Sequence, residues 1–297
     1  MIYYLIASIL IAVTALFART KRAVLAAGIL FYAVQIAAAG LLLWGGLYDT
    51  TSAAFFTFDA LGTLFYLLLV VVSMYVFGHS EAYLQGEDLR SYRLYFALLM
   101  LLTTAIAGAY FANNLAVTWI FLEATTLCSA GIIYHRRTAQ ALEAAWKYVF
   151  VCSTGIAMAY LGILLLAAAT KCETLSYEAV AEAASSGNPL YLKTAFLLIL
   201  SGYSCKLELF PLYTVGIDAN FAAPAPASAL ISTGLVNAGF LALLRVYKLL
   251  AGTRRSAFPG RGLCSTQRLA LASAFCSALL SSACITCGMT TFIRRTI

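Results

Sequence analysis

Eight long apolar segments follow one another along this chain of 297 residues and constrain its fold more than any other feature. A helix needs about 20 apolar residues to cross the hydrocarbon core of a bilayer. These segments are apolar on all sides, as helices surrounded by lipid are. The sequence therefore predicts an all-α, polytopic membrane protein of eight to nine transmembrane helices. The eight segments are 2–17, 24–44, 56–77, 94–112, 115–134, 144–169, 192–210 and 225–250, and the ninth is about 269–285.

Charged residues are scarce and unevenly placed. Hydrophobic residues make up 63% of the chain and charged residues 10%, which leaves no room for an extended soluble domain. Arginines after residue 250 supply most of the formal net charge of +7, and every acidic residue lies at or before Asp218. Without that tail the charge is close to neutral, so the basic balance does not indicate a nucleic-acid partner.

Basic residues in the short connections predict the orientation in the membrane. They follow the first, third and fifth segments, whereas the connections after the second and fourth segments have none. These residues are Arg19, Lys21, Arg22, Arg90, Arg93, Arg136 and Arg137. We therefore expect the odd-numbered connections in the cytoplasm and the N-terminus outside. The first segment has no positive charge before it, so it is expected to be a retained helix rather than a signal peptide.

The stretch 201–230, SGYSCKLELFPLYTVGIDANFAAPAPASAL, interrupts the seventh apolar segment. Pro211 lacks a backbone donor and clashes with the preceding turn, so we expect the helix to kink or break there. In a bilayer a break is tolerated only where the freed backbone groups meet protein, water or a cavity. Lys206 lies beside this break, and an ionisable residue at membrane depth indicates a functional site. The alternative is that Lys206 only pairs with an acid to hold two helices together.

A set of residues in this stretch carries a family resemblance. The set is Gly202, Tyr203, Lys206, Pro211, Leu212, Asp218 and Ala219, followed by Ala223-Pro224-x-Pro226-x-Ser228-Ala229-Leu230. These residues resemble the broken seventh helix of the antiporter-like subunits, and the resemblance covers about residues 2–250. That family comprises proton-pumping membrane subunits of respiratory complex I, of hydrogenase-4-type hydrogenases and of multi-subunit sodium/proton antiporters. The departures from the family's P-L-H-x-W-x-P-D-A-H pattern are Tyr213, Val215, Ile217 and Asn220.

Glu123 lies near the middle of the fifth segment, in WIFLEATTLCSAG. A charge at the centre of a membrane helix costs about 2.5–3.5 kcal/mol on insertion scales, so this carboxylate should face the bundle and meet a cation or water. The Glu-x-Thr-Thr-Leu context resembles the fifth helix of the family. The resemblance implies that Glu123 pairs with Lys206 for proton transfer, and the alternative is a static buried ion pair.

Three further residues are candidates for the proton path. Lys147 follows Glu143 by four positions, which favours an ordinary helix ion pair, whereas the resemblance implies a second proton-transfer lysine. Asn237 stands where the family carries a bridging lysine or histidine, and it can bond water but cannot hold a proton at neutral pH. Asp218, in the loop after the break, is a relay candidate whose alternative role is to fix that loop.

Other charged residues are given structural or open roles. Asp59 is expected at a helix terminus. Arg245 and Lys248 are expected to extend to the membrane interface, with their charged ends in water. Glu208 is two positions from Lys206 and on a helix would point to a different face, so its role is left open.

The chain divides into three predicted regions. Residues 1–92 form an N-terminal three-helix region, and residues 93–250 form a five-helix antiporter-like unit around the broken helix. Residues 251–297 are rich in Arg, Ser and Thr and hold a lone Cys284-x-x-Cys287 pair, which is a weak metal motif. We interpret this tail as a shifted reading frame in a truncated chain, and the alternative is a natural short variant with an arginine-rich anchor.

The sequence holds no dinucleotide-binding or P-loop motif, no HExxH motif and no cysteine cluster typical of an iron–sulfur centre. It therefore predicts no cofactor and no metal, and any redox chemistry would belong to partner subunits. The leading prediction is a proton-translocating, non-redox subunit of a hydrogenase-4-like or complex-I-like complex in the inner cell membrane. The alternatives are a subunit of a sodium/proton antiporter, and an inactive or scaffolding fragment.

Overall fold

The computed structural model describes residues 1–44, 55–172, 174–184, 187–209 and 212–257, the last seven by backbone alone. Over these residues the chain is helical apart from turns and two isolated backbone bridges, which confirms the all-α prediction. The helices are α1 (Ile2–Phe17), α2 (Lys21–Leu43), α3 (Ala60–Tyr83), α4 (Leu89–Phe111), α5 (Leu115–Ile133), η1 (Tyr134–Arg136), α6 (Ala139–Thr170), α7 (Tyr177–Ala184), α8 (Pro189–Ser204), α9 (Tyr213–Ala222), α10 (Ala225–Leu230), η2 (Ile231–Leu235) and α11 (Val236–Ala257).

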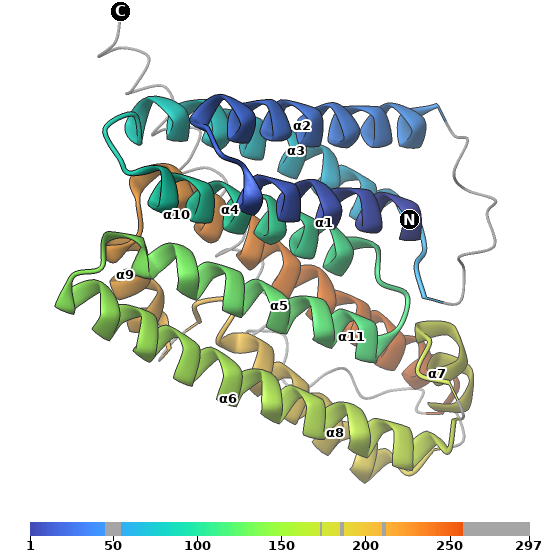
Figure 1. Ribbon diagram of the computed structural model, residues 1–297. Coiled ribbons are helices and arrows are strands. Elements are labelled where there is room, and N and C mark those ends of the chain that lie inside the picture. Colours follow the sequence, from blue (N-terminus) through green and yellow to red (C-terminus); the bar gives the residue numbers. More distant parts are fainter. Residues whose placement is uncertain (45–54, 173, 185–186, 210–211, 258–297) are drawn as a thin grey trace, which may run out of the picture.

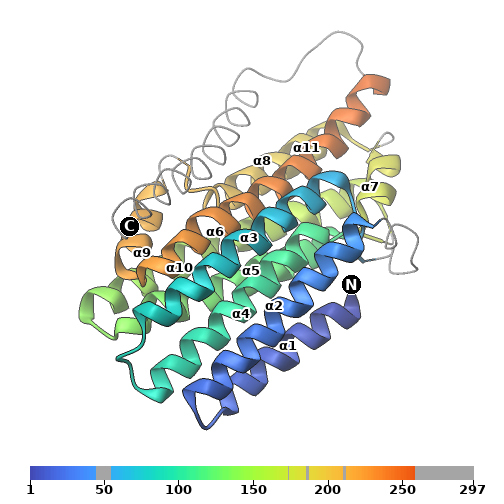
Figure 2. The same cartoon turned by 90° about the horizontal axis from the view of Figure 1, so that it is seen from above.

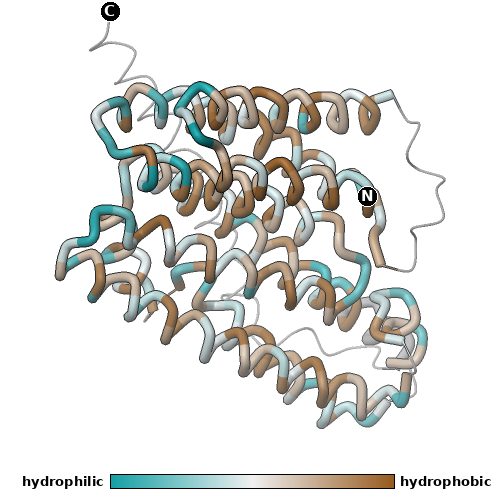
Figure 3. The backbone as a smooth tube through the Cα atoms, viewed as in Figure 1, coloured by the Kyte–Doolittle hydropathy of each residue, from teal (hydrophilic) through white to brown (hydrophobic). Residues whose placement is uncertain are grey.

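Six helical stretches in the described residues are long and apolar enough to cross a membrane. They are α2, α3, α4, α5 with η1, α6, and the continuous run from α10 to α11. Helices α1 and α8 are apolar but have 16 residues each. Figure 3 shows apolar residues along the helices and polar residues gathered at the connections. The predicted ninth segment and residues 258–297 lie outside the described residues.

Several helices begin at a polar residue whose side chain accepts a hydrogen bond from the first turn. Thr20, Asn114, Thr138 and Asn188 cap α2, α5, α6 and α8 in this way. Asp59 caps α3, where its Oδ1 accepts the backbone N–H of Gly62 at 3.2 Å. The prediction that Asp59 terminates a helix is confirmed.

The long helices run side by side in one bundle (Figures 1 and 2). Helix α4 lies inside it, in contact with α1, α3 and α5. The most apolar stretch of α4 is 83% buried within the protein, against 33% for α2 at the edge. Helix α6 packs against α5 on one side and against α8 and α9 on the other. The candidate functional site lies between α5, α6, α8 and α11.

The connections after α1, α3 and α5 lie at one end of the bundle, and the N-terminus lies at the other (Figure 1). Lys21 Nζ donates to the carbonyl of Gln85 at 2.9 Å, and Arg93 donates to the carbonyl of Ala18 at 3.2 Å. These bonds join the first basic connection to the second. The basic connections therefore share one end, as the sequence predicted, while the side of the membrane that this end faces stays a prediction.

The seventh apolar segment is broken, as predicted, but the break begins well before Pro211. Helix α8 ends at Ser204, the chain turns through residues 205–208, and α9 begins at Tyr213. The backbone N–H of Lys206 donates to the carbonyl of Tyr203 at 3.0 Å, a tighter turn than in an α-helix. Lys206 therefore lies in the break itself rather than within a helix, and Pro211 lies outside the described residues.

The eighth apolar segment is also irregular. It consists of α10, one π-helical turn in η2, and α11, without a gap in the chain. Tyr110 of α4 donates its hydroxyl to the carbonyl of Gly234 in this turn at 3.1 Å. A π-helical turn inside a helix frequently marks a functional site, and here it precedes Asn237 and Gly239 on the helix that faces Lys206.

Candidate functional site

Lys206 is enclosed by three helices, α5, α6 and α11. Only 2% of the residue is exposed. Its ammonium donates to Thr125 Oγ1 and to Tyr148 Oη, each at 3.4 Å, and lies 5.3 Å from the centre of the Tyr148 ring. Thr125 stands in the middle of α5 and Tyr148 belongs to α6, so the ammonium lies where those two helices meet the break.

A glycine on α11 allows this close approach. A Cβ atom placed on Gly239 would lie 3.1 Å from the Cβ of Lys206, which is tighter than an ordinary contact. Since glycine has no Cβ, α11 packs directly against the turn that carries the lysine. The enclosure of Lys206 thus depends on a residue 33 positions further along the chain.

The ammonium of Lys206 is poorly satisfied for a buried cation. Protein N–H···O bonds usually measure about 2.7–3.2 Å, and both of its contacts are longer. Across the described part of the chain, no carboxylate lies within 4.0 Å of it. An isolated buried ammonium is costly and tends to give up its proton. The site therefore favours a lysine that exchanges a proton.

Glu123 lies on the same helix as Thr125 but is held by other groups. Its Oε1 accepts the hydroxyl of Ser153 at 2.7 Å, and its Oε2 accepts that of Thr126 at 3.5 Å. Among the described residues, no ion pair of 4.0 Å or less joins Glu123 to Lys206. Both residues contact α5 and α6, so they share one interface, and their functional pairing stays a prediction.

A small cavity adjoins Lys206 on the side of the break. It has about 10 Å³ of space and is lined by Tyr148, Cys152, Cys205, Lys206, Glu208, Val215, Gly216, Ile231 and Leu235. That volume is about enough for one water molecule. Glu208 and Lys206 therefore line the same cavity, and the expectation that they face different directions is wrong. The helix has already ended at Ser204, so helical spacing does not apply to them.

Lys147 is at the surface and not inside the bundle. Its ammonium lies 2.7 Å from Glu143 Oε1, the i,i+4 pair that the sequence favoured, and 3.4 Å from Asp218 Oδ2. The three side chains are 50%, 66% and 47% exposed, respectively. Asp218 lies in α9 rather than in a loop, so its ion pair with Lys147 links α9 to α6. Val215 and Gly216 of the same helix line the cavity.

Asn237 is buried on α11, two residues after the π-helical turn. The residue is 2% exposed, and among the described residues its Oδ1 has no hydrogen-bond partner. It lines a narrow space with Tyr110 of α4 and Thr233 of η2. A buried amide oxygen without a protein partner is the kind of group that ordered water satisfies.

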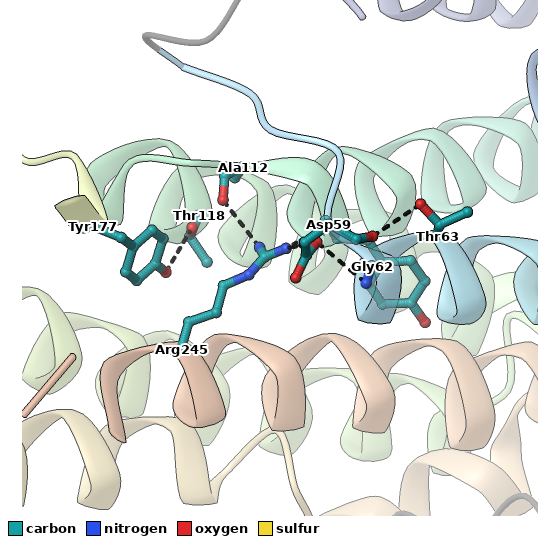
Figure 4. Close-up of polar contacts among 8 residues, drawn as sticks. Asp59, Gly62, Thr63, Ala112, Thr118, Tyr177 and Arg245 are labelled. Atoms are coloured by element: carbon teal, nitrogen blue, oxygen red, sulfur yellow. Dashed lines mark hydrogen bonds and ion pairs between the residues drawn. The ribbon is translucent and has the colours of Figure 1, made fainter. Parts of the chain in front are cut away.

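Arg245 forms a second buried cation site, which the sequence analysis missed (Figure 4). Its side chain is 11% exposed, and its Nη2 lies 2.8 Å from Asp59 Oδ1. The same guanidinium donates to the carbonyls of Ala112, at 3.0 Å, and Tyr110 at the end of α4, and lies 6.0 Å from the ring of Tyr177. The expectation that the charged end of Arg245 lies in water is wrong, because the carbonyls at the end of α4 and the cap of α3 hold it, while its position relative to the membrane interface stays a prediction.

One signal in the sequence could have found this pair. Asp59 and Arg245 are 186 positions apart, so no local motif joins them. However, Asp59 begins the third predicted segment and Arg245 lies near the end of the eighth. Alternating helix directions bring both positions to the same end of the bundle. Lys248, by contrast, is exposed.

The comparisons with known proteins agree with this architecture. The chain is 31% identical over 230 residues to a hydrogenase-4 component F homolog of Methylacidiphilum infernorum, covering 73% of this chain and 48% of the relative. It is 33% identical over 154 residues to the NADH-quinone oxidoreductase subunit N of Deinococcus radiodurans, covering 51% of this chain and 31% of the relative. The chain thus spans less than half the length of these relatives.

A solved structure shares the fold. The membrane-bound sulfane sulfur reductase, an archaeal respiratory membrane complex, contains a chain that matches with a TM-score of 0.72 at 22% identity, covering 85% of this chain and 53% of that one.

The family match concerns the second part of the sequence. It covers residues 112–296, more than half of the chain, and so includes the break, Asn237 and most of the tail. The family match runs past residue 250, where we expected the resemblance to end. The division into three regions and the interpretation of the tail as a shifted reading frame stay predictions. The chain belongs to the family described as NADH:quinone oxidoreductase/Mrp antiporter, transmembrane.

Proposed function

We propose that this chain is a proton-translocating, non-redox membrane subunit of a hydrogenase-4-like or complex-I-like oxidoreductase, with Lys206 as its central proton carrier. The observation that carries the proposal is the environment of Lys206: a buried ammonium with two long contacts to hydroxyl groups and no carboxylate within ion-pair distance among the described residues. A static structural cation would be held by short bonds to several acceptors.

Three other features support a path through the same helices. Glu123 lies between α5 and α6 with one short hydrogen bond, so its carboxylate is available to accept a proton from the direction of Thr125 and Lys206. Lys147 and Asp218 form an exposed cluster at the junction of α6 and α9, where protons from water could be collected. Asn237 on α11 adds a buried polar group on the side of α4. Because an amide cannot hold a proton at neutral pH, proton transfer past Asn237 would depend on water.

The partners and the orientation are part of the proposal. The relatives named above are subunits of larger complexes, so we infer that other membrane subunits contact this chain and that a redox partner drives it. We also infer that the basic end of the bundle faces the cytoplasm of an inner cell membrane and that the N-terminus lies outside, from the positions of the basic connections. A sodium/proton antiporter subunit is the second candidate, because the family description includes Mrp antiporters.

Purification of the native complex on a tagged copy of this chain tests the proposal. We expect redox subunits to copurify, and we expect the complex in liposomes to move protons during electron transfer. Lys206→Met should abolish this movement, whereas Lys193→Met, which alters an exposed lysine on α8, should leave it unchanged.

Three results would contradict the proposal. Copurification of antiporter subunits with sodium-dependent proton flux would favour the second candidate. Undiminished transport by Lys206→Met would exclude Lys206 as the carrier. Transport-inactive complexes that still require the chain for assembly would favour the scaffolding role.

A further inference from the structure

We propose that Glu208 is a second proton carrier, which exchanges a proton with Lys206 through one water molecule in the cavity between them. This inference rests on the proposed function, because it adds a residue to the proton path of the same site. The family resemblance and the sequence pattern gave Glu208 no role.

The backbone at Glu208 adopts an unusual conformation. Its φ angle is 51°, in the left-handed region that residues with a side chain disfavour. Two other described residues with a side chain share this conformation, Arg137 and Lys171, and both end a helix at its C-cap. Glu208 likewise closes the helical turn that follows α8, because the N–H of Leu209 donates to the carbonyl of Ser204 at 3.2 Å.

The conformation turns the carboxylate of Glu208 into the protein. A Cβ atom on Gly216 would overlap the carboxylate group of Glu208, so the glycine on α9 leaves the space that this side chain fills. Glu208 is only partly exposed, and among the described residues its carboxylate takes part in no ion pair or hydrogen bond. A carboxylate half-buried without protein partners is expected to bond water.

The cavity supplies the place for that water. Its volume of about 10 Å³ holds about one molecule. A buried water needs two to four polar partners, and three of the residues that line this cavity, Lys206, Glu208 and Tyr148, carry polar side-chain groups. A water bonded to the first two groups would join a proton donor to a proton acceptor.

The proposed step balances without any redox partner. The ammonium of Lys206 gives one proton to the water, and the water gives one of its protons to the carboxylate of Glu208. An N–H bond breaks, an O–H bond forms on the glutamate, and the products are a neutral amine and a neutral carboxylic acid. Removal from bulk water favours the neutral form of both groups. The reverse transfer restores the charged pair.

The step also connects the buried lysine to the surface. Glu208 faces α9 at Gly216, and Asp218 on the same helix pairs with the exposed Lys147. A proton on Glu208 is therefore carried by a residue that contacts α9, the helix that also holds Asp218. We infer that Glu208 gates exchange between Lys206 and the end of the bundle where Lys147 lies.

The test compares Glu208→Gln with Glu178→Gln, an exposed glutamate on α7, in the purified native complex in liposomes. Glu208→Gln keeps the size of the side chain but cannot take up a proton. We expect it to slow proton transport by about 100-fold, the lower end of the range for a positioned acid–base group, with unchanged thermal unfolding. Glu178→Gln should transport as the parent does.

Infrared difference spectra across a pH step give an independent readout. The parent should show the carbonyl stretch of a protonated carboxylic acid, and Glu208→Gln should lack that band. Glu208→Gly, which relieves the left-handed backbone, should fold at least as well as the parent and still transport slowly, so a folding defect cannot explain the loss.

The outcomes separate this inference from the proposed function. Parent-like transport by Glu208→Gln, or an infrared band that this variant leaves unchanged, overturns the role of Glu208. If Lys206→Met still loses transport, the proposed function stands. Parent-like transport by Lys206→Met overturns both.

Discussion

Lys206 and Arg245 are both cations inside the same bundle, one in the break after α8 and one on α11 near α7. Arg245 has a carboxylate at 2.8 Å, two carbonyls and an aromatic ring around it. Lys206 has two hydroxyl groups, each at 3.4 Å. The guanidinium of Arg245 is therefore well satisfied by its partners, whereas the ammonium of Lys206 is poorly satisfied.

The difference follows from the backbone around each residue. Arg245 meets the C-terminus of α4, where free carbonyls and the helix dipole attract a cation, and it also meets the cap of α3. Lys206 meets the sides of α5 and α6, whose backbone groups are already bonded within the helices. In our proposal, partial satisfaction rather than burial alone distinguishes the group that exchanges protons from the one that stabilises the fold.

Replacing Lys206 by arginine is expected to have the largest effect on proton transport. Lys206→Arg keeps a positive charge but cannot lose its proton, since arginine stays protonated in proteins. We expect proton transport by the reconstituted complex to fall below detection, while the complex still assembles. Transport near the parental rate would mean that only the charge matters at this position.

Replacing Arg245 by lysine should lower stability without affecting proton transport. Arg245→Lys loses the planar fork that contacts Asp59 and the end of α4, and hydrogen bonds to charged groups contribute about 1.5–3 kcal/mol. We expect the free energy of unfolding to fall by about 2 kcal/mol, measured by denaturant unfolding in detergent, with normal transport per folded complex. Lys248→Arg is the matched control on the same helix. A specific loss of transport would place Arg245 in the proton path.

A smaller effect is expected where α11 meets the break. In Gly239→Ala the new methyl group would lie 3.1 Å from the Cβ of Lys206 and would shift the lysine by a few tenths of an ångström. We expect partly reduced transport, because proton transfer depends on hydrogen-bond distance. Gly78→Ala has open space around it and should be neutral. Equal behaviour of the two variants would show that the packing of α11 does not tune Lys206.

The smallest effect is expected at the exposed cluster. Glu143→Gln removes one of the two carboxylates of Lys147 and leaves Asp218 in place. Exposed ion pairs contribute little to stability, so thermal unfolding should not change and transport should fall only slightly, mainly at low ionic strength. A large loss of transport at all salt concentrations would show that Glu143 itself carries the proton.

Much of this architecture could be predicted from residue order. Hydrophobic segment length predicted the long helices, because burial of the backbone in lipid leaves a helix as the only local solution. The position of Asp59 at a helix terminus and the pairing of Glu143 with Lys147 are also local: the first was predicted from the start of the third segment and the second from a spacing of four residues. The break was predicted from Pro211, although its start at Ser204 was not, since the tight turn after Tyr203 has no strong sequence signal.

The sequence by itself determined that this chain is a helical membrane protein with a broken seventh segment and a lysine beside the break. Tertiary structure alone decided what surrounds each charge. Arg245 became internal through partners on α3 and α4, and Glu208 came to share a cavity with Lys206 because a left-handed residue turns the chain back toward α9. Hydrophobic patterns are read within one helix, whereas the satisfaction of a buried charge depends on residues from several helices, which only packing brings together.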